Sequence, residues 1–333
     1  MNITKFNKKF NQPSDISTDI IDKITDTLKS GELFRYNKKF SYVKLFEKNL
    51  SLMFGVKYVL CVNSCGSALH LSLKTFNLDK NDIVLMNEFS LSPVVSAINN
   101  IGCKVEYVKI NKNLIIDTND LLSKIKKFKP KILLLSHMRS FFPKMDEIKK
   151  ICDLNNVKII EDAAHTMGIK YKDKYIGTWG EIGCFSLQSY KQINAGEGGI
   201  IITNNPDIFS KLIILSGSYM YFKEHDLKPD DIYFKDLIYN IPNYSSRFNE
   251  IAAIIANSQL NDLFKNNLIR NKKYLFFRKL LDENEIIEFP NLVDFDNFSP
   301  TSILFYLNLS YDKIIKFVNE CKKNECNCKL FWI

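Results

Sequence analysis

The sequence predicts an α/β fold with a mostly parallel sheet covered by helices on both faces and a smaller C-terminal α+β domain. Two observations support this prediction. Short apolar runs alternate with helix-like patterns between residues 57 and 215, which is typical of a doubly covered parallel sheet. The chain has 333 residues, too many for one small core, and we expect a large domain over 1–265 and a small one over 266–333.

The expected elements follow from the spacing of apolar residues and from the capping residues and glycines at helix ends. A helix over 16–29 is predicted between a Ser14-Asp15 cap and Gly31, and a second over 40–54 ends at Gly55. Apolar runs predict strands at 57–62, 82–86, 104–110, 131–135, 157–160, 182–187 and 200–202. Further helices are predicted at 87–99 after a turn, 118–127, 145–154, 207–215 and 248–260, and the small domain has a strand at 303–309 and a helix at 311–321. Residues 216–246 lack periodicity and are predicted to form a long loop, a feature that tends to be functional.

Composition narrows the class of protein. The apolar fraction of 46% is ordinary for a globular protein, and the longest apolar runs fall short of the roughly 18 residues that span a bilayer. The first five residues do not open a signal peptide, so we expect a cytoplasmic protein with no membrane partner. The net charge of +9 comes from scattered Lys, without a basic, aromatic-interleaved stripe, so no nucleic-acid partner is predicted.

The cysteines indicate a reduced interior. Most of the 8 lie within apolar runs, as buried thiols of cytosolic proteins do. Cys321, Cys326 and Cys328 cluster near the end of the chain, but their spacing does not match common zinc-ligand patterns and no His lies nearby. We therefore predict no metal.

The candidate chemistry lies between residues 157 and 204. The run at 157–160 delivers Glu161 and Asp162 to the C-terminal end of a strand, where open α/β sheets bind ligands. Lys191 follows the run at 182–187 and precedes a glycine-rich turn at 196–199. Taken singly, Asp162 reads as a helix N-cap and Lys191 as a solvated lysine. Taken together, they suit pyridoxal phosphate, because a desolvated Lys forms a Schiff base and a carboxylate keeps the pyridine nitrogen protonated.

The same segment closely resembles the DegT-type sugar aminotransferases, which are fold-type-I pyridoxal phosphate enzymes. The resemblance rests on Glu161-Asp162-Ala163-Ala164-His165, Gly183-Cys184-Phe185-Ser186, Lys191 and Gly196-Glu197-Gly198-Gly199-Ile200, in that order and spacing. It implies that Asp162 pairs with the pyridine nitrogen and that His165 lies beside the ring. It further implies that Ser186 contacts the phosphate and Lys191 forms the Schiff base. We also assign Gln188, in the polar run before Lys191, to the cofactor site.

Three cofactor positions depart from the family pattern. Gly66 stands where the family often has Thr, so Ser67 and backbone amides at the start of a helix are expected to bind the phosphate. Leu91 stands where the family has a stacking aromatic, so either Phe89 substitutes for it or the ring is held more loosely. Ser245 replaces an Asn that contacts the phosphate. The resemblance covers about 15–330, and the small domain is expected to be shortened or to lack its tail.

The resemblance implies an aminotransferase that moves an amino group from a donor, glutamate, to a keto- or aldehyde-sugar for surface polysaccharide such as lipopolysaccharide. Lys191, once released, is the natural base for the proton at Cα. The resemblance also implies a homodimer with shared sites, in which the segment around Ser245 and Arg247 reaches the partner's site. Arg247 is accordingly a candidate substrate residue.

Arg139 suggests an acidic acceptor. It follows the apolar run at 131–135, where relatives that act on nucleotide-linked sugars generally carry no Arg, and Arg is scarce in this chain. A guanidinium suits a carboxylate, and the segment resembles that of relatives that aminate 3-deoxy-octulosonate. The alternatives are a structural ion pair and a contact with the donor's carboxylate.

Two other functions remain open. The family includes sugar dehydratases, but these carry His at the position of Lys191. A non-catalytic regulatory or assembly protein would fit the short C-terminus and Leu91, whereas the intact Asp162 and Lys191 favour an enzyme.

Overall fold

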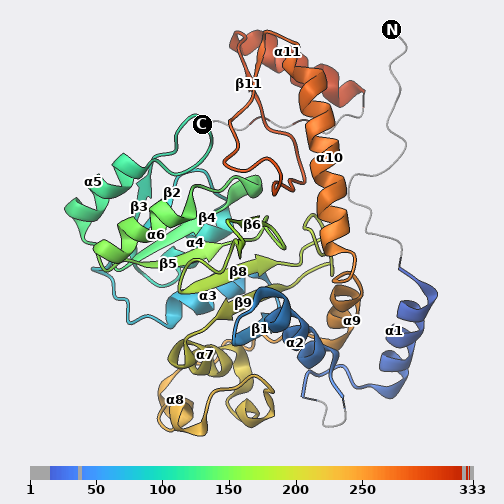
Figure 1. Cartoon of the computed structure of the whole chain (residues 1–333). Helices are drawn as coiled ribbons and strands as arrows, with labels where there is room; N and C mark the ends of the chain where they lie inside the picture. The colour runs from blue at the N-terminus through green and yellow to red at the C-terminus, as the bar shows by residue number, and fades with distance from the viewer. Residues whose placement is uncertain (1–15, 37–39, 325–327, 329, 331–333) are drawn as a thin grey trace.

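The computed structural model describes residues 16–36, 40–324, 328 and 330, and it is built around one sheet of seven strands (Figure 1). The strands are β1 (Tyr58–Val62), β2 (Ile83–Asn87), β3 (Lys104–Val108), β4 (Ile132–Ser136), β5 (Lys158–Asp162), β8 (Ile182–Ser186) and β9 (Gly199–Thr203). Their order is β1-β9-β8-β5-β4-β2-β3, and only β9 runs antiparallel to its neighbours. The predicted α/β fold with a mostly parallel sheet is confirmed.

Helices cover both faces because both faces of the central strands are apolar. The helices around the sheet are α2 (Tyr42–Phe54), α3 (Cys65–Lys74), α4 (Ser92–Asn99), α5 (Thr118–Phe128), α6 (Met145–Leu154), α7 (Pro206–Ile213) and α9 (Glu250–Ser258). One core lies between the sheet and α3, α4 and α7. The opposite face packs on α5 and α6 at one end and on α2 and α9 at the other.

Several helix ends agree with the sequence. The first helix, α1 (Thr18–Ser30), ends at Gly31 with a left-handed φ of 72°, and α2 ends at Gly55 with φ of 66°. Ser41 caps α2 by accepting a hydrogen bond from the Lys44 N–H. Ser14 and Asp15, the predicted cap of α1, lie outside the described residues.

Two predicted elements need correction. Residues 216–246 are not one open loop: they contain a π-helical turn (Ile214–Ser218), 3-10 turns (Phe222–Glu224 and Asp231–Phe234) and a short helix α8 (Leu237–Asn240). Aromatic side chains such as Phe234 pack into the core there, and periodicity does not reveal such short turns. The strand predicted at 303–309 is reduced to β11 (Tyr306–Leu307), paired with β10 (Ile287–Glu288).

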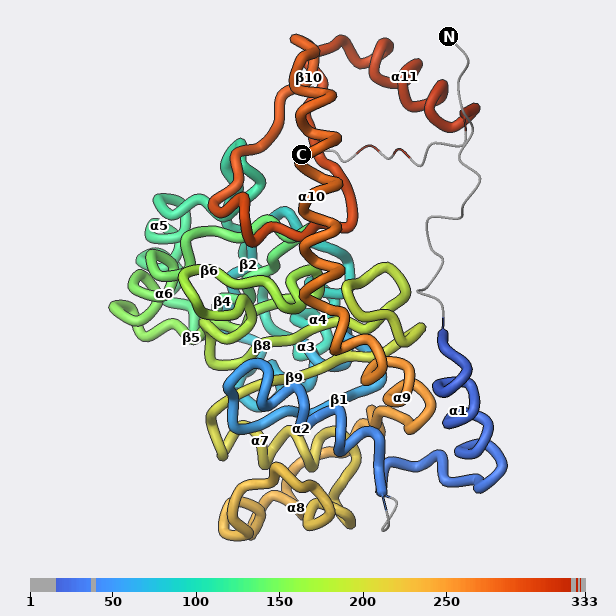
Figure 2. The backbone as a smooth tube through the Cα atoms, turned by 45° about the vertical axis from the view of Figure 1, so that its right-hand side comes forward, coloured from blue at the N-terminus to red at the C-terminus, as the bar shows by residue number. Residues whose placement is uncertain are grey.

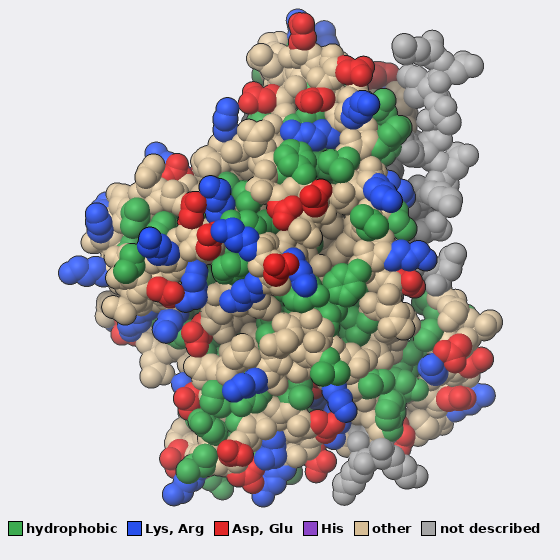
Figure 3. Space-filling model, in the orientation of Figure 1, with side chains coloured by type: hydrophobic (Ala, Val, Ile, Leu, Met, Phe, Trp, Pro, Cys, Tyr) green, Lys and Arg blue, Asp and Glu red, His purple; other side chains and the backbone are tan. Residues whose placement is uncertain are grey.

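The sequence did not indicate the β6–β7 hairpin (Lys170–Tyr171 and Lys174–Tyr175) or the long helix α10 (Leu263–Asp282). Figure 2 shows α10 rising from α9 toward β10 and α11 (Tyr311–Lys323). The proposed domain boundary at 265/266 falls within α10. On the face drawn in Figure 3, Lys and Arg are interspersed with Asp and Glu.

Glu161 joins three parts of the large domain. Its side chain is fully buried and accepts hydrogen bonds from the backbone N–H groups of Gly177, Trp179 and Gly180 at 2.6–2.8 Å. The Nε2 of His137, just after β4, lies 3.0 Å from the same carboxylate. One buried carboxylate therefore fixes the turn after β7 against β4 and β5.

Replacing Glu161 with Ala should destabilise the fold. The change leaves three backbone N–H donors, one buried and two part-buried, without their acceptor, and we expect the free energy of unfolding to fall by about 3 kcal/mol or more. Urea unfolding followed by circular dichroism measures it. Glu147→Ala, an exposed change in α6, is the control and should shift the free energy by less than about 1 kcal/mol. Equal effects of the two substitutions would contradict this role.

Candidate active site

The candidate site lies where β4, β5 and β8 end. Ser136 and Asp162 are opposite each other in the β4–β5 register, and Asp162 is opposite Cys184 in β8. Because β4, β5 and β8 are parallel, their C-terminal ends meet at one edge of the sheet. The side chains of Ser136 and Asp162 are both buried at this edge.

Lys191 reaches the same edge from a tight turn. Its backbone N–H bonds to the carbonyl of Gln188, and the Gln188 side chain accepts a hydrogen bond from the Tyr190 N–H. The half-buried Lys191 Nζ lies 2.9 Å from the Nε2 of His165. The turn thus brings the Lys191 amine to His165, and Gln188 shapes the turn.

Burial sets the electrostatics of this pair. Desolvation lowers the pKa of Lys191 from its usual 10.5; the nearby charge of Asp162 opposes this shift and that of Arg139 adds to it. Desolvation, with the charges of Lys191 and Arg139, holds the pKa of His165 well below its usual range. Because His165 is a neutral imidazole, it adds no positive charge beside Lys191.

Asp162 is held in a fixed orientation. Its Oδ2 accepts a hydrogen bond of 2.6 Å from the Ser136 hydroxyl, and its Oδ1 accepts one of 3.2 Å from the Ala164 N–H. Residues 163–168 form turns, so the reading of Asp162 as a helix N-cap is wrong. Ser136 was not among the predicted site residues, although a hydroxyl at the end of an apolar strand was the available signal.

The turn before α3, around Ser64–Ser67, is the segment predicted to cradle the phosphate. Ser64 caps α3: its Oγ accepts from the Ser67 N–H and donates to the Ser67 hydroxyl, both at 3.0 Å. A Cβ on Gly199 would lie 2.2 Å from the Ser64 carbonyl oxygen, so only glycine lets β9 lie against this turn. The space around Gly66 is open, with Ser64 Oγ 3.8 Å from a Cβ placed there. Ser186 is buried at the end of β8.

The stacking position has no aromatic side chain. Leu91 precedes α4 and is 40% exposed. Phe89 is 7% exposed and packs with Met138, Phe141 and Phe298 at the junction with the C-terminal part. This packing of Phe89 does not favour its substitution for the stacking aromatic, and a ring held more loosely beside Leu91 stays a prediction.

Ser245 and Arg247 contact residues other than those around Lys191. Arg247 donates a 2.7 Å hydrogen bond to the Gly217 carbonyl and stacks on Phe34, while the exposed Ser245 bonds to Asn243. The backbone beside them approaches the cradle: the Asn63 N–H bonds to the Ser246 carbonyl, and Val62 pairs with Arg247.

Arg139 lies close to the Lys191 group. It is half-buried, has a left-handed φ of 55° in a short turn (Met138–Ser140), and burial lowers its pKa from the usual 12.5. Its charge lowers the pKa of both Lys191 and His165, which places it within electrostatic reach of them.

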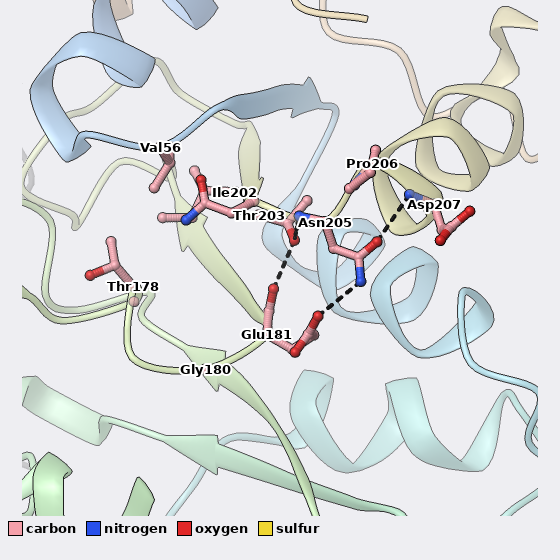
Figure 4. A pocket seen from close by; sticks show the side chains of 11 residues that line it. Val56, Thr178, Gly180, Glu181, Ile202, Thr203, Asn205, Pro206 and Asp207 are labelled. Atoms are coloured by element: carbon pink, nitrogen blue, oxygen red, sulfur yellow. Dashed lines mark hydrogen bonds between the residues drawn. The ribbon is translucent and has the colours of Figure 1, made fainter. Parts of the chain in front are cut away.

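A pocket of about 460 Å³ lies at the opposite edge of the sheet (Figure 4). Its polar groups satisfy one another: the Thr203 hydroxyl donates to the Glu181 carbonyl, and the Asn205 side chain bonds to both the Glu181 carboxylate and the Asp207 N–H. We place the candidate site at Lys191, where an amine with a lowered pKa lies within electrostatic reach of the buried Asp162 carboxylate.

Comparison with known proteins identifies the family of the chain. Residues 14–332 match the model of the DegT/DnrJ/EryC1/StrS aminotransferase family. The chain belongs to this family. Family members use pyridoxal phosphate, and the residues here fit it: Lys191 for the aldehyde, Asp162 for the ring nitrogen, and the amides before α3 for the phosphate.

Two curated relatives are named as enzymes of nucleotide-linked sugars. The chain is 29% identical over 277 residues to the UDP-4-amino-4,6-dideoxy-N-acetyl-beta-L-altrosamine transaminase of Campylobacter jejuni, covering 83% of this chain and 70% of that one. It is also 29% identical to the GDP-perosamine synthase of Escherichia coli O157:H7, covering 67% of this chain and 58% of that one. The chain thus spans a little over half to about two thirds of these relatives.

Solved structures share the fold. The aminotransferase PseC of Helicobacter pylori superimposes with a TM-score of 0.80 at 21% identity, covering 97% of this chain and 83% of that one. The E. coli GDP-4-keto-6-deoxy-D-mannose-3-dehydratase with bound hydrated PLP superimposes with a TM-score of 0.78 at 22% identity, covering 93% and 82%.

The described residues were also searched for a membrane-spanning helix and for a metal site. Among them, no helix is long and apolar enough to cross a membrane. In the same residues, His, Cys, Asp and Glu form no group of three suited to a metal ion, and Cys326 of the cysteine cluster lies outside them.

The lowered pKa of Lys191 can be measured by competitive acylation of the protein freed of cofactor. Asp162→Asn removes a charge that raises this pKa, so half-maximal labelling should move to lower pH. Arg139→Gln removes a charge that lowers it, so labelling should move to higher pH. The exposed Lys104 serves as internal reference. A shift in the same direction for both variants would refute this electrostatic arrangement.

Proposed function

We propose that the protein is a pyridoxal-phosphate-dependent aminotransferase that transfers an amino group from an amino acid, glutamate, to a keto- or aldehyde-sugar. The observation that carries this proposal is the Lys191 amine, desolvated, 2.9 Å from a neutral His165 and within the field of Asp162. The relatives named as sugar transaminases support the class of acceptor. We further propose that the enzyme acts in the cytoplasm. Its product would be used for surface polysaccharide such as lipopolysaccharide.

The residues divide the chemistry among them. Bound pyridoxal phosphate supplies a ring that withdraws electrons from the Cα of the attached amino acid. Asp162 holds a proton at the ring nitrogen, which maintains this withdrawal. Lys191 would hold the cofactor covalently, and its free amine would move the proton at Cα of the donor. His165 lies beside the ring without adding charge.

Borohydride reduction followed by peptide mapping tests the assignment. The phosphopyridoxyl group should be found on Lys191, and Asp162→Asn should bind cofactor yet lose nearly all of the glutamate half-reaction, since an amide does not hold the pyridinium proton. The modification on another lysine, or an Asp162→Asn variant that reacts at the parent rate, would overturn the proposal.

A sugar dehydratase of the same fold is the second candidate, because one solved structure with this fold is such an enzyme. Lys191 opposes it, since the family's dehydratases carry His at this position. A non-catalytic role is opposed by the intact Lys191, His165 and Asp162 group.

We further propose that Arg139 binds an acidic acceptor of the 3-deoxy-octulosonate class. Its half-buried guanidinium lies within electrostatic reach of Lys191, where a planar fork suits a carboxylate. A contact with the donor's carboxylate and a structural ion pair are the alternatives, and the relatives' names favour a nucleotide-linked acceptor.

Arg139→Lys distinguishes these possibilities. If Arg139 holds the acceptor, KM for the acidic keto-sugar should rise about tenfold or more while the glutamate half-reaction stays nearly unchanged, because the bidentate contact is lost for one substrate. Arg278→Lys, near Tyr274 and Pro290, is the matched control. A weaker glutamate reaction, or turnover of nucleotide-linked sugars alone, contradicts the acidic-acceptor proposal.

The protein is also proposed to be a homodimer with shared sites. Exposed apolar side chains flank the Arg247 group, among them Phe34, Met220 and Tyr221, and others line α10. Light scattering should give twice the chain mass. Mixing Lys191→Ala with Arg247→Ala subunits should restore part of the activity, because hybrid dimers contain one intact site. A fully active monomer would refute the dimer.

A further inference from the structure

The end of β4 contacts the carboxylate assigned to the cofactor ring. Ser136 Oγ lies 2.6 Å from Asp162 Oδ2, and both side chains are 5% exposed. An ionised carboxylate only accepts hydrogen bonds, so the hydroxyl is the donor. A hydrogen bond of this length to a buried charge belongs to the strong class.

The backbone of Ser136 is held independently of the Asp162 side chain. Asn87, the last residue of β2 and 2% exposed, accepts the Ser136 N–H at 2.8 Å and donates to the Ser136 carbonyl at 3.1 Å. The third bond of this amide goes to the Phe89 carbonyl at 2.9 Å. On the other side, the His137 N–H bonds to the Asp162 carbonyl at 3.0 Å. These bonds fix the Ser136 hydroxyl relative to Asp162 without help from any ligand.

We propose that Ser136 is a positioning residue that keeps the shared proton on the cofactor's ring nitrogen instead of on Asp162. The inference rests on the proposed cofactor site and deepens it. A proton shared by a carboxylate and a pyridine nitrogen lies on the nitrogen when the ionised form of the carboxylate is stabilised. The Ser136 hydroxyl stabilises the ionised carboxylate, so it favours pyridinium, the form that withdraws electrons.

The arrangement also selects an oxygen of Asp162. Oδ2 is engaged by the short bond from Ser136, whereas Oδ1 has the longer contact with the Ala164 N–H. The ring nitrogen would therefore be met by Oδ1, with the carboxylate plane fixed by Ser136. Without the hydrogen bond from Ser136, the Asp162 carboxylate would be free to rotate about its side-chain torsions.

The test uses the holoprotein loaded with pyridoxal phosphate labelled with ¹⁵N in the ring. In Ser136→Ala the ¹⁵N resonance should move downfield, toward neutral pyridine, and the donor half-reaction should slow about ten- to hundredfold, the effect of one lost bond to a buried charge. Ser136→Thr restores the hydroxyl and should restore the resonance. Ser136→Cys, a weaker donor, should lie between them and serves if the Ala variant does not fold.

Two controls separate the possible failures. Ser72→Ala removes a buried hydroxyl that bonds to the Ala68 carbonyl and the Cys184 thiol, and it should leave the resonance unchanged. Asp162→Asn should move the resonance fully to neutral pyridine. If Asp162→Asn does so and both Ser136→Ala and Ser136→Cys match the parent, the role of Ser136 is wrong. If Asp162→Asn itself changes nothing, the proposed function loses its electron sink.

Discussion

The two-residue period of β5 is the constraint on which the site depends. Successive side chains of a strand point to opposite faces, so Glu161 and Asp162 face opposite sides of the sheet although they are adjacent in the chain. Glu161 accepts three backbone N–H groups and holds the turn at 177–180. Asp162 bonds to Ser136 on the face covered by α3. A one-residue shift of β5 would exchange these environments and destroy both.

Desolvation is the main cause of the lowered pKa of both Lys191 and His165. Burial is the largest effect on the pKa of both Lys191 and His165, and it acts in the same direction on each, toward the neutral form. Asp162 opposes this shift at Lys191, so the pKa of the amine falls only as far as the effect of burial outweighs that of the carboxylate charge. Mutations that admit water to this pocket should therefore disturb the chemistry before they disturb the fold.

Polar contacts tie the C-terminal part of the chain to the candidate site. The side chains of Gln192 and Ser140 both donate to the carbonyls of His165 and Ser299, at 2.5–3.3 Å. Asn267 of α10 accepts a hydrogen bond from the Ser299 hydroxyl. The position of His165 beside Lys191 is thus connected to the segment that packs against α10.

The sequence alone predicts the α/β class, most strands and the position of Asp162 and Lys191 after two apolar strands, because apolar runs and glycine turns are local signals. It also indicated the Ser64–Ser67 turn before α3. The tertiary structure set the features that depend on contacts between distant segments, for which the sequence has no local signal. It buried Phe89 in one hydrophobic cluster with Phe298, a residue distant in the chain, and left Leu91 exposed. It also set Ser136 against Asp162, because strand register across β4 and β5 decides which hydroxyl meets which carboxylate.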